Sequence, residues 1–140
     1  MQGLNTTAVH GHTALFGVYG MLGIGLMLFC LKGLASRQSW RTGSLWFAFW
    51  AINVGLALMV LLSLLPVGLL QTWASVEHGM WYARSAEFLQ SGLMNNLRWM
   101  RIVGDTIFAF GVVSLGWFVL GLKTGWSLAP GQDAHVPPKP

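Results

Sequence analysis

The sequence contains few charged residues. Only 9% of its 140 residues are Asp, Glu, Lys or Arg, whereas an average soluble domain carries about 25%. Hydrophobic residues make up 54% of the chain, and the mean hydropathy is +0.58. Such a chain cannot cover a water-facing surface with charge, and it is too apolar to be largely disordered. The composition therefore excludes a soluble globular domain and predicts an integral membrane protein.

Cysteine is nearly absent as well, which excludes disulfide-rich proteins and proteins with cysteine metal clusters. Cys30 is the one cysteine, so neither a disulfide framework nor a thiolate metal cluster is expected. The net charge of +4 is compatible with nucleic-acid binding, but the basic residues are scattered and form no patch with interleaved aromatics. We therefore expect no nucleic-acid partner. The chain also lacks a phosphate-binding loop, a hydrolase triad and a CxxC motif.

Three stretches with almost no charge are long enough to cross a bilayer, which takes about 20 residues. They run from Leu4 to Leu31, from Thr42 to Leu70 and from Ile102 to Leu122. Backbone polar groups must be satisfied inside lipid, so each stretch is predicted to be a helix. No basic residue precedes the first stretch, so we do not expect a cleavable signal peptide. The predicted spans are residues 8–31, 43–70 and 103–122.

The charges of the connecting segments suggest how the chain is oriented across the membrane. The loop 32–41 carries three basic residues and no acid, and segment 71–101 carries three arginines and two glutamates. Counting basic residues alone does not discriminate, but their density in the shorter loop favours a cytoplasmic location for residues 32–41. The C-terminus would then also be cytoplasmic, and segment 71–101 would be periplasmic.

Segment 71–101 is predicted to be a short interfacial helical cap over the helix ends, broken near Ser91 and Gly92. Aromatic residues typical of a bilayer–water boundary surround it. Its apolar face is formed by residues at helical spacing: Leu89, Leu93, Leu97 and Met100. The predicted fold is thus an all-α membrane protein over residues 1–128, followed by a disordered Pro-rich tail at 129–140.

His10 and His12 are the clearest candidates for chemistry. In a helix, residues i and i+2 point about 200° apart, so these side chains cannot grip one metal ion together but can each bind a separate centre. Gly11 lies between them and further glycines follow, which allows flat groups or other helices to approach closely. A histidine in a membrane helix is by default a functional-site hypothesis. The alternative is that both histidines lie in a water-facing N-terminal tail and bind nothing.

The residues around this pair resemble a known family. The run His10–Leu31 resembles the helix of the heme–copper oxidase superfamily that supplies axial ligands to two hemes, and it is most similar to the nitric oxide reductase branch. Leu64–Gly68, Gln71–Phe88 and Leu97–Phe108 look like the single-chain, quinol-dependent form of that enzyme. The resemblance covers nearly the whole chain except the Pro-rich tail.

The resemblance implies a role for each histidine. His10 matches the axial ligand of the high-spin heme b, and His12 matches an axial ligand of the low-spin heme b. Two ligands on one short stretch of backbone hold the hemes close together for electron transfer. The family's reaction joins two NO molecules, two electrons and two protons into N2O and water, with quinol as the electron source. The implied location is the bacterial inner membrane, in a respiratory chain.

The resemblance also implies that the chain is incomplete. In the family, earlier helices supply the ligands of a non-heme iron and the second histidine of the low-spin heme. The remaining histidines, His78 and His135, lie outside the predicted spans and cannot take those roles. The chain therefore resembles the C-terminal part of the enzyme, inactive alone. Its expected partners are membrane lipid and the missing N-terminal helices, with NO and quinol as substrates of the complete enzyme.

Arginines and acids near the predicted helix ends are further candidates. Arginine suits bidentate contact with heme propionates; lipid headgroup contacts or ion pairs with Glu77 or Glu87 are the alternative. The candidate arginines are Arg84, Arg98 and Arg101.

Glu77 and Asp105 are candidates for a proton route, because acids at membrane depth often serve in one. His78, beside Glu77, could assist proton uptake or contact quinol. The simpler interpretation of Asp105 is that it caps the N-terminus of the third span.

Two other functions fit the residues without the resemblance. One is a non-catalytic three-helix protein with structural or assembly duties. The other is a self-associating heme b cytochrome in which His12 from two copies meets on one heme, since symmetric pairing permits this.

Overall fold

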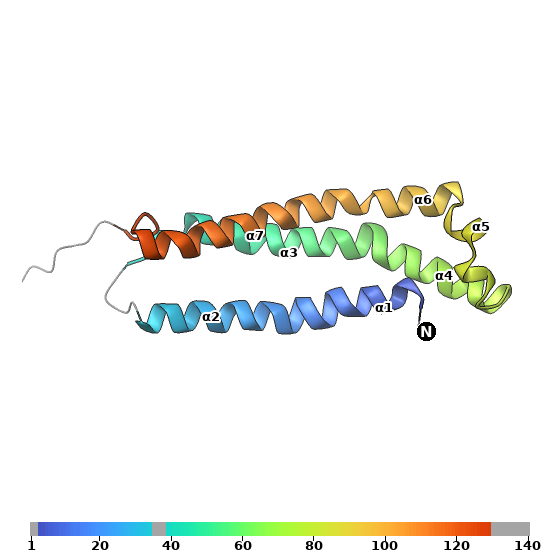
Figure 1. Cartoon of the computed structure of the whole chain (residues 1–140), viewed down its shortest axis with the longest axis horizontal. Helices are drawn as coiled ribbons and strands as arrows, with labels where there is room; N and C mark the ends of the chain where they lie inside the picture. The colour runs from blue at the N-terminus through green and yellow to red at the C-terminus, as the bar shows by residue number, and fades with distance from the viewer. Residues whose placement is uncertain (1–2, 35–38, 130–140) are drawn as a thin grey trace, which may run out of the picture.

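The computed structural model describes residues 3–34 and 39–129, which contain helices and no β-strand. Three long helices lie side by side (Figure 1). The first consists of α1 (Asn5–His10), the π-helical η1 (Gly11–Gly20) and α2 (Met21–Leu34). The second consists of α3 (Gly43–Met59), the π-helical η2 (Val60–Leu64) and α4 (Leu65–Glu77). The third consists of α6 (Gly92–Trp99) and α7 (Arg101–Thr124), preceded by the 3-10 turn η3 (Tyr82–Arg84) and α5 (Ala86–Leu89).

All three helices are long and apolar enough to cross a membrane, as predicted. They span 30, 35 and 33 residues, with mean hydropathies of 2.1, 2.3 and 1.8. Since about 20 residues suffice, each helix exceeds its predicted span. The second continues past Leu70 to Glu77, and the third begins at Gly92 rather than near Ile102. The predicted all-α membrane fold is confirmed, with helices longer than the apolar runs alone indicate.

The segment predicted as an interfacial cap contains two short helices. Ser85 caps α5, its Oγ accepting from the Phe88 N–H at 3.2 Å, and Ser91 is the N-cap residue of α6. Leu89 ends α5 whereas Leu93 lies in α6, so the predicted apolar face is divided between two helices. α6 then continues through Met100 into α7, which makes this part of the segment the beginning of the third long helix.

α3 and α7 form the closest helix pair, because small residues line their contact. A Cβ atom on Gly55 would lie 2.5 Å from the Phe108 backbone nitrogen, and one on Gly104 would lie 2.5 Å from that of Met59. Close backbone approach over small residues is a main source of helix association in membranes. A hydrogen bond between the helices adds to it: the Ser114 Oγ donates to the Ser44 carbonyl at 3.0 Å.

The second helix bends between α3 and α4 (Figure 1). Pro66 is the second residue of α4, separated from the end of η2 by Leu65. A proline inside a helix removes one backbone hydrogen bond and crowds the carbonyl four residues earlier. The π-helical widening over Val60–Leu64 accommodates this crowding and turns α4 toward α1.

The first helix is held mainly at its N-terminal end. α1 packs against α4 and η2, and η1 touches α3, although no residue of Asn5–Leu34 is fully buried. None of the most apolar window of this helix is buried, against 44% of the corresponding window in the second helix. The part of the first helix that carries the histidines is therefore the part that packs on the second helix.

Backbone hydrogen bonds join the segment before α3 to the segment after α7. Trp40 and Leu128 form an antiparallel bridge, and the Arg41 N–H donates to the Ser127 carbonyl at 2.8 Å. The Ala129 N–H donates to the Ser39 carbonyl at 2.8 Å. Arg37 and residues 130–140, which include most of the predicted tail and His135, lie outside the described residues.

Candidate functional site

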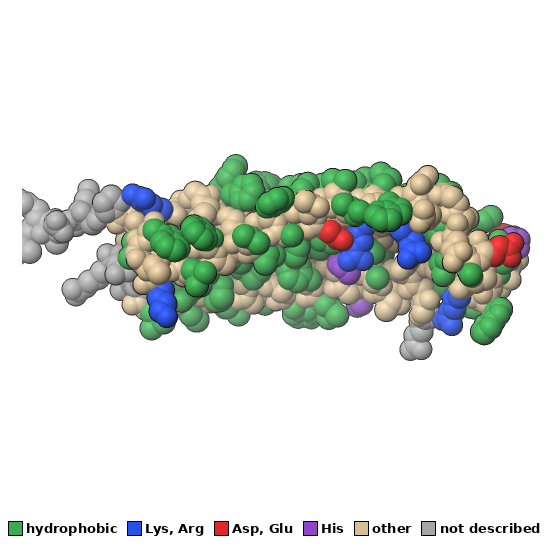
Figure 2. Space-filling view, turned by 45° about the horizontal axis from the view of Figure 1, so that its top comes forward, with side chains coloured by type: hydrophobic (Ala, Val, Ile, Leu, Met, Phe, Trp, Pro, Cys, Tyr) green, Lys and Arg blue, Asp and Glu red, His purple; other side chains and the backbone are tan. Residues whose placement is uncertain are grey.

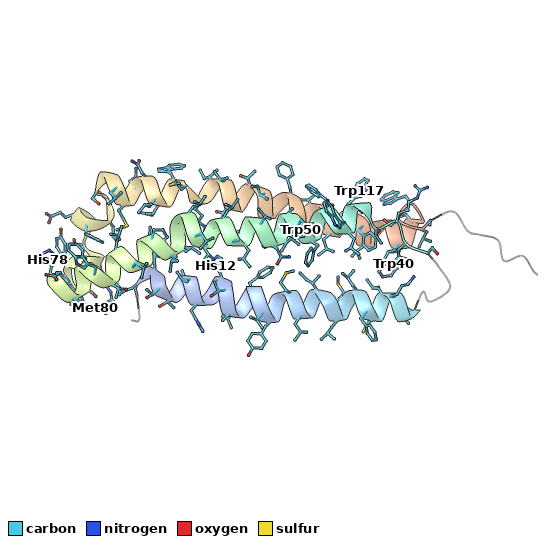
Figure 3. All side chains as sticks on the ribbon, turned by 180° about the vertical axis from the view of Figure 1, so that it is seen from behind. His12, Trp40, Trp50, His78, Met80 and Trp117 are labelled. Atoms are coloured by element: carbon cyan, nitrogen blue, oxygen red, sulfur yellow. The ribbon has the colours of Figure 1, made fainter. Side chains whose placement is uncertain are left out.

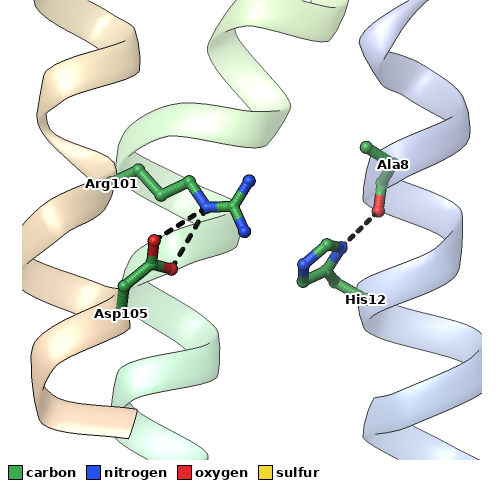
Figure 4. A network of polar contacts seen from close by, with 4 residues as sticks. All are labelled: Ala8, His12, Arg101 and Asp105. Carbon is green, nitrogen blue, oxygen red and sulfur yellow. Dashed lines mark hydrogen bonds and ion pairs between the residues drawn. The ribbon is translucent and has the colours of Figure 1, made fainter. Parts of the chain in front are cut away.

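His12 lies in η1 with its ring turned toward α7 (Figure 4). Its Nδ1 is 2.8 Å from the Ala8 carbonyl oxygen. A carbonyl only accepts hydrogen bonds, so Nδ1 carries the proton and donates. In a neutral imidazole this leaves the lone pair on Nε2 available for a metal, and a carbonyl partner of this kind commonly orients histidines that bind metals.

Side-chain hydrogen bonds accompany the π-helical segment that begins after His10. Besides His12, Thr13 donates through its Oγ1 to the Val9 carbonyl at 2.7 Å. Side-chain donors that reach carbonyls four residues earlier compete with the regular backbone ladder and deform helices. π-helical segments occur often at functional sites, and this one contains His12 and starts next to His10.

A cavity of about 560 Å³ lies between the three long helices beside His12. The edge-to-face contact between Phe16 and Phe108, with centroids 5.2 Å apart, links the first and third helices at its wall. Its boundary is largely apolar with one charged pair: Phe16, Leu56, Met59, Phe108, Arg101 and Asp105. His10 is exposed and does not line this cavity, so the two histidines serve different sides of the helix.

Arg101 and Asp105 form an ion pair one helical turn apart on α7. The Arg101 Nε lies 3.1 Å from both carboxylate oxygens of Asp105. The guanidinium extends past Asp105 toward His12 (Figure 4). The two side chains are 41% and 44% exposed, so the cavity they border is open to solvent on this side.

The prediction that Asp105 caps the third span is wrong. Met100 is the N-cap residue of α7, and no side chain caps this end. α6 runs through Met100 into α7, so no free helix end lies near Asp105. Its carboxylate is paired with the guanidinium of Arg101 instead.

Arg98 and Arg101 are brought together, and Arg84 is not with them. A second cavity, of about 490 Å³, is lined by both arginines and Asp105, together with Asn5 and Ser63. Arg84 lies in η3 beside Gly3. The alternative expectation of a pair with Glu77 or Glu87 does not hold for Arg101, whose acidic partner is Asp105.

Glu77 and His78 lie at the end of the molecule, away from His12 (Figure 3). Glu77 is the exposed last residue of α4. His78 makes edge contacts with Trp73 and Tyr82, with centroids 6.2 and 5.0 Å apart. The structure therefore does not bring Glu77 and Asp105 together, and their proton-route role stays a prediction.

The polar groups of this region stand out from the rest of the surface. Figure 2 shows basic, acidic and histidine side chains gathered near the middle of one face, with further charged side chains toward both ends of the molecule. Over residues 3–34 and 39–129 there is no group of three or more His, Cys, Asp or Glu side chains able to hold a metal ion. His10 and His12 are thus separate single donors.

Sequence reasoning missed the aromatic pair and Met59 as cavity walls. Phe16 has a partner, Phe108, in another helix, and no local pattern marks such a distant contact. A weak signal existed for Phe16, which lies four residues after His12 and therefore near the same face of a helix.

The donor set fits a heme. A membrane-embedded helical bundle presents one oriented imidazole to an apolar, aromatic-walled cavity with a guanidinium at its edge. A heme needs an axial nitrogen, an apolar cavity for the macrocycle and partners for its carboxylates. These features are those of a helical membrane protein with a cavity that suits a heme.

The comparison with protein families agrees with a heme-related membrane protein. The family model described as Cytochrome C and Quinol oxidase polypeptide I matches residues 1–107. The chain belongs to this family, subunit I of the heme–copper oxidases, whose members bind heme and metal and whose complete enzymes are oxidoreductases. The match includes both histidines and every residue of the His12 cavity except Phe108. No curated protein matches the chain.

Proposed function

We propose that the chain is the heme-ligating C-terminal part of a quinol-dependent nitric oxide reductase of the inner membrane. The observation that carries this proposal is the His12 ring, which donates from Nδ1 to Ala8 and faces an apolar cavity. His10 lies two residues earlier and outside that cavity. In this proposal one helix offers one imidazole to each of two centres.

In this proposal His12 holds the iron of the low-spin heme b, and His10 that of the high-spin heme b. The bound hemes supply one-electron redox chemistry. The Ala8 carbonyl fixes the tautomer and the ring plane of His12. Phe16, Met59 and Phe108 give the site apolar walls.

Arg101 is the proposed partner of a heme propionate. Asp105 engages its Nε, while the rest of the guanidinium points toward His12. Arg98 lines the adjoining cavity and adds a second positive charge there. Arg84 lies outside both cavities.

The nitric oxide branch rests on the resemblance of Gln71–Phe88 and Leu97–Phe108, because the matching family is described by its oxidases. The complete enzyme would turn two NO into N2O and water with electrons from quinol. The non-heme iron and the second ligand of the low-spin heme would come from N-terminal helices. Asp105, which borders both cavities, would take part in proton uptake on the periplasmic side with Glu77.

The first experiment is an immunoblot of source membranes with an antibody against residues 129–140. A band several times larger than 15.3 kDa supports a longer enzyme that ends in this segment. The polypeptide recognised by the antibody is then purified, and its heme b content and NO consumption with quinol are measured. A purified full-length protein without heme contradicts the proposal, and a heme protein that reduces oxygen but not NO contradicts the nitric oxide branch.

A structural or assembly role is the second candidate. The observation in its favour is α2, which has no buried residue and offers an apolar face to partner helices. A natural 15 kDa polypeptide that purifies without heme but with other membrane proteins would support this role.

A further inference from the structure

Gln71 is a buried polar residue that joins three segments. It lies in α4 with 4% of its surface exposed. Its Oε1 accepts a hydrogen bond from the Asn5 backbone N–H at 2.7 Å, and its Nε2 donates to the Ala83 carbonyl at 3.2 Å. One side chain thus connects the start of α1, the middle of α4 and η3.

The bond to Asn5 replaces a local helix cap. Asn5 is the first residue of α1, and the first N–H groups of a helix have no acceptor within it. The N-cap residue is Leu4, whose side chain offers no acceptor. Gln71, 66 residues away in sequence, supplies the acceptor.

Apolar packing adds to this attachment. Leu4 is buried with Ala74 and Ala83, so it sits between α4 and η3. Gly68 lies so close to α1 that a Cβ atom there would be 3.0 Å from the Thr6 backbone nitrogen. The first turn of α1 therefore has a close fit on α4.

The rest of the first helix has no comparable attachment. The packing contacts of the helix with its neighbours are concentrated in α1 and η1. His10 and His12 follow Asn5 by five and seven residues in the same continuous helix. Any shift or fraying at Asn5 is thus transmitted to both imidazoles over fewer than about two helical turns.

We propose that Gln71 is a positioning residue for both histidines: by capping Asn5 and holding η3, it sets where the ligand helix lies on α4. The proposal rests on the proposed function, in which His10 and His12 bind hemes. Gln71 touches neither histidine and acts through the first turn of α1. Metal sites depend on such supporting contacts for their geometry.

The test uses the complete purified protein with three variants. Gln71→Leu removes both hydrogen bonds at similar volume, and Gln71→Glu keeps an acceptor for Asn5 but loses the donor to Ala83. Gln90→Leu is the control, since Gln90 is exposed between α5 and α6. Amide hydrogen exchange of residues 5–12 is measured alongside the absorption spectrum and midpoint potentials of the hemes.

We expect Gln71→Leu to speed exchange over residues 5–12 about tenfold, as the loss of a buried hydrogen bond does, and to shift the low-spin heme spectrum or potential. Gln71→Glu should stay closer to the parent, and Gln90→Leu should match it. If Gln71→Leu does not accumulate, Gln71→Asn, whose shorter side chain cannot reach both partners, is measured instead.

Two results overturn the proposal. One is exchange over residues 5–12 that stays at the level of the Gln90→Leu control. The other is faster exchange with unchanged heme signals in a protein whose heme is lost on His12→Ala, because Gln71 would then support the fold without placing the ligand. Low-spin heme signals that survive His12→Ala contradict the proposed function instead, so the two failures are distinguishable.

Discussion

Arg101 places its Nε 3.1 Å from both carboxylate oxygens of Asp105, one turn further along α7. Both side chains are more than one-third exposed, and a pair of this kind contributes only about 0.3–0.5 kcal/mol to stability. The main effect of this ion pair is on the orientation of the Arg101 guanidinium. With Asp105 on the Nε side, the terminal nitrogens of the guanidinium point toward His12 (Figure 4).

Asp105→Ala should therefore affect the midpoint potential of the low-spin heme more than the stability of the fold. We expect a loss of unfolding free energy below about 1 kcal/mol and a higher midpoint potential of the low-spin heme, because removing a nearby negative charge favours the reduced state. Redox titration of the purified complete protein measures this, with Glu87→Ala in α5 as the control. An unchanged potential would contradict the proximity of Asp105 to that heme.

His10→Ala and His12→Ala should each remove a different heme. Each imidazole faces its own side of the helix, so loss of one ligand leaves the other in place. We expect His12→Ala to abolish the low-spin spectrum and His10→Ala to abolish the high-spin one, with one heme lost in each. Heme quantification and difference spectra distinguish them. His78→Ala, at the far end of the molecule (Figure 3), should retain both hemes.

Gly104→Ala should destabilise the protein through the contact between α3 and α7. The added methyl would lie 2.5 Å from the Met59 backbone nitrogen, so the helices must separate. Overpacking of this type costs about 1–3 kcal/mol. Gly116→Ala is the matched control in the same helix, since a Cβ there meets no atom within 4 Å. Denaturant unfolding in detergent measures both, and equal stability would contradict the close approach.

Ser114→Ala should weaken the same helix pair by less. Its Oγ donates across to the Ser44 carbonyl, and hydrogen bonds between membrane helices average about 0.6 kcal/mol. Thr124→Ala is the comparison, because the Thr124 hydroxyl bonds within its own helix, to the Leu120 carbonyl. A loss of unfolding free energy in the Thr124 variant as large as in the Ser114 variant would refute a special role for the interhelical bond.

The helical architecture was predictable because membrane helices are a property of composition over long stretches. The three apolar runs predicted three helices, which the structure contains. Their ends were not predictable in the same way. The continuation to Glu77 includes Gln71, whose partners are Asn5 and Ala83, and the bond to Asn5 spans 66 residues. Contacts at that separation leave no periodic pattern in the sequence.

In the site, too, the features set by local helix geometry were predictable, and the features set by distant contacts were not. Helix geometry alone predicted that His10 and His12 face different sides, and only His12 lines the cavity. The role of Asp105 was misjudged because capping depends on where a helix begins. That point is set by Ser91 and α6 rather than by residues near Asp105. Phe108 as a cavity wall required the packing of α7 against the other helices.

The backbone bonds between residues 39–41 and 127–129 have a consequence for the order of assembly. Together with the short connection through η3 and α5, they close the second and third long helices into a hairpin fastened at both ends. That hairpin holds the closest helix packing in the molecule, whereas α2 adds no buried residue to it. The contact between α3 and α7 is therefore complete without the first helix, so the histidine-bearing helix can dock onto the hairpin as a separate step of folding.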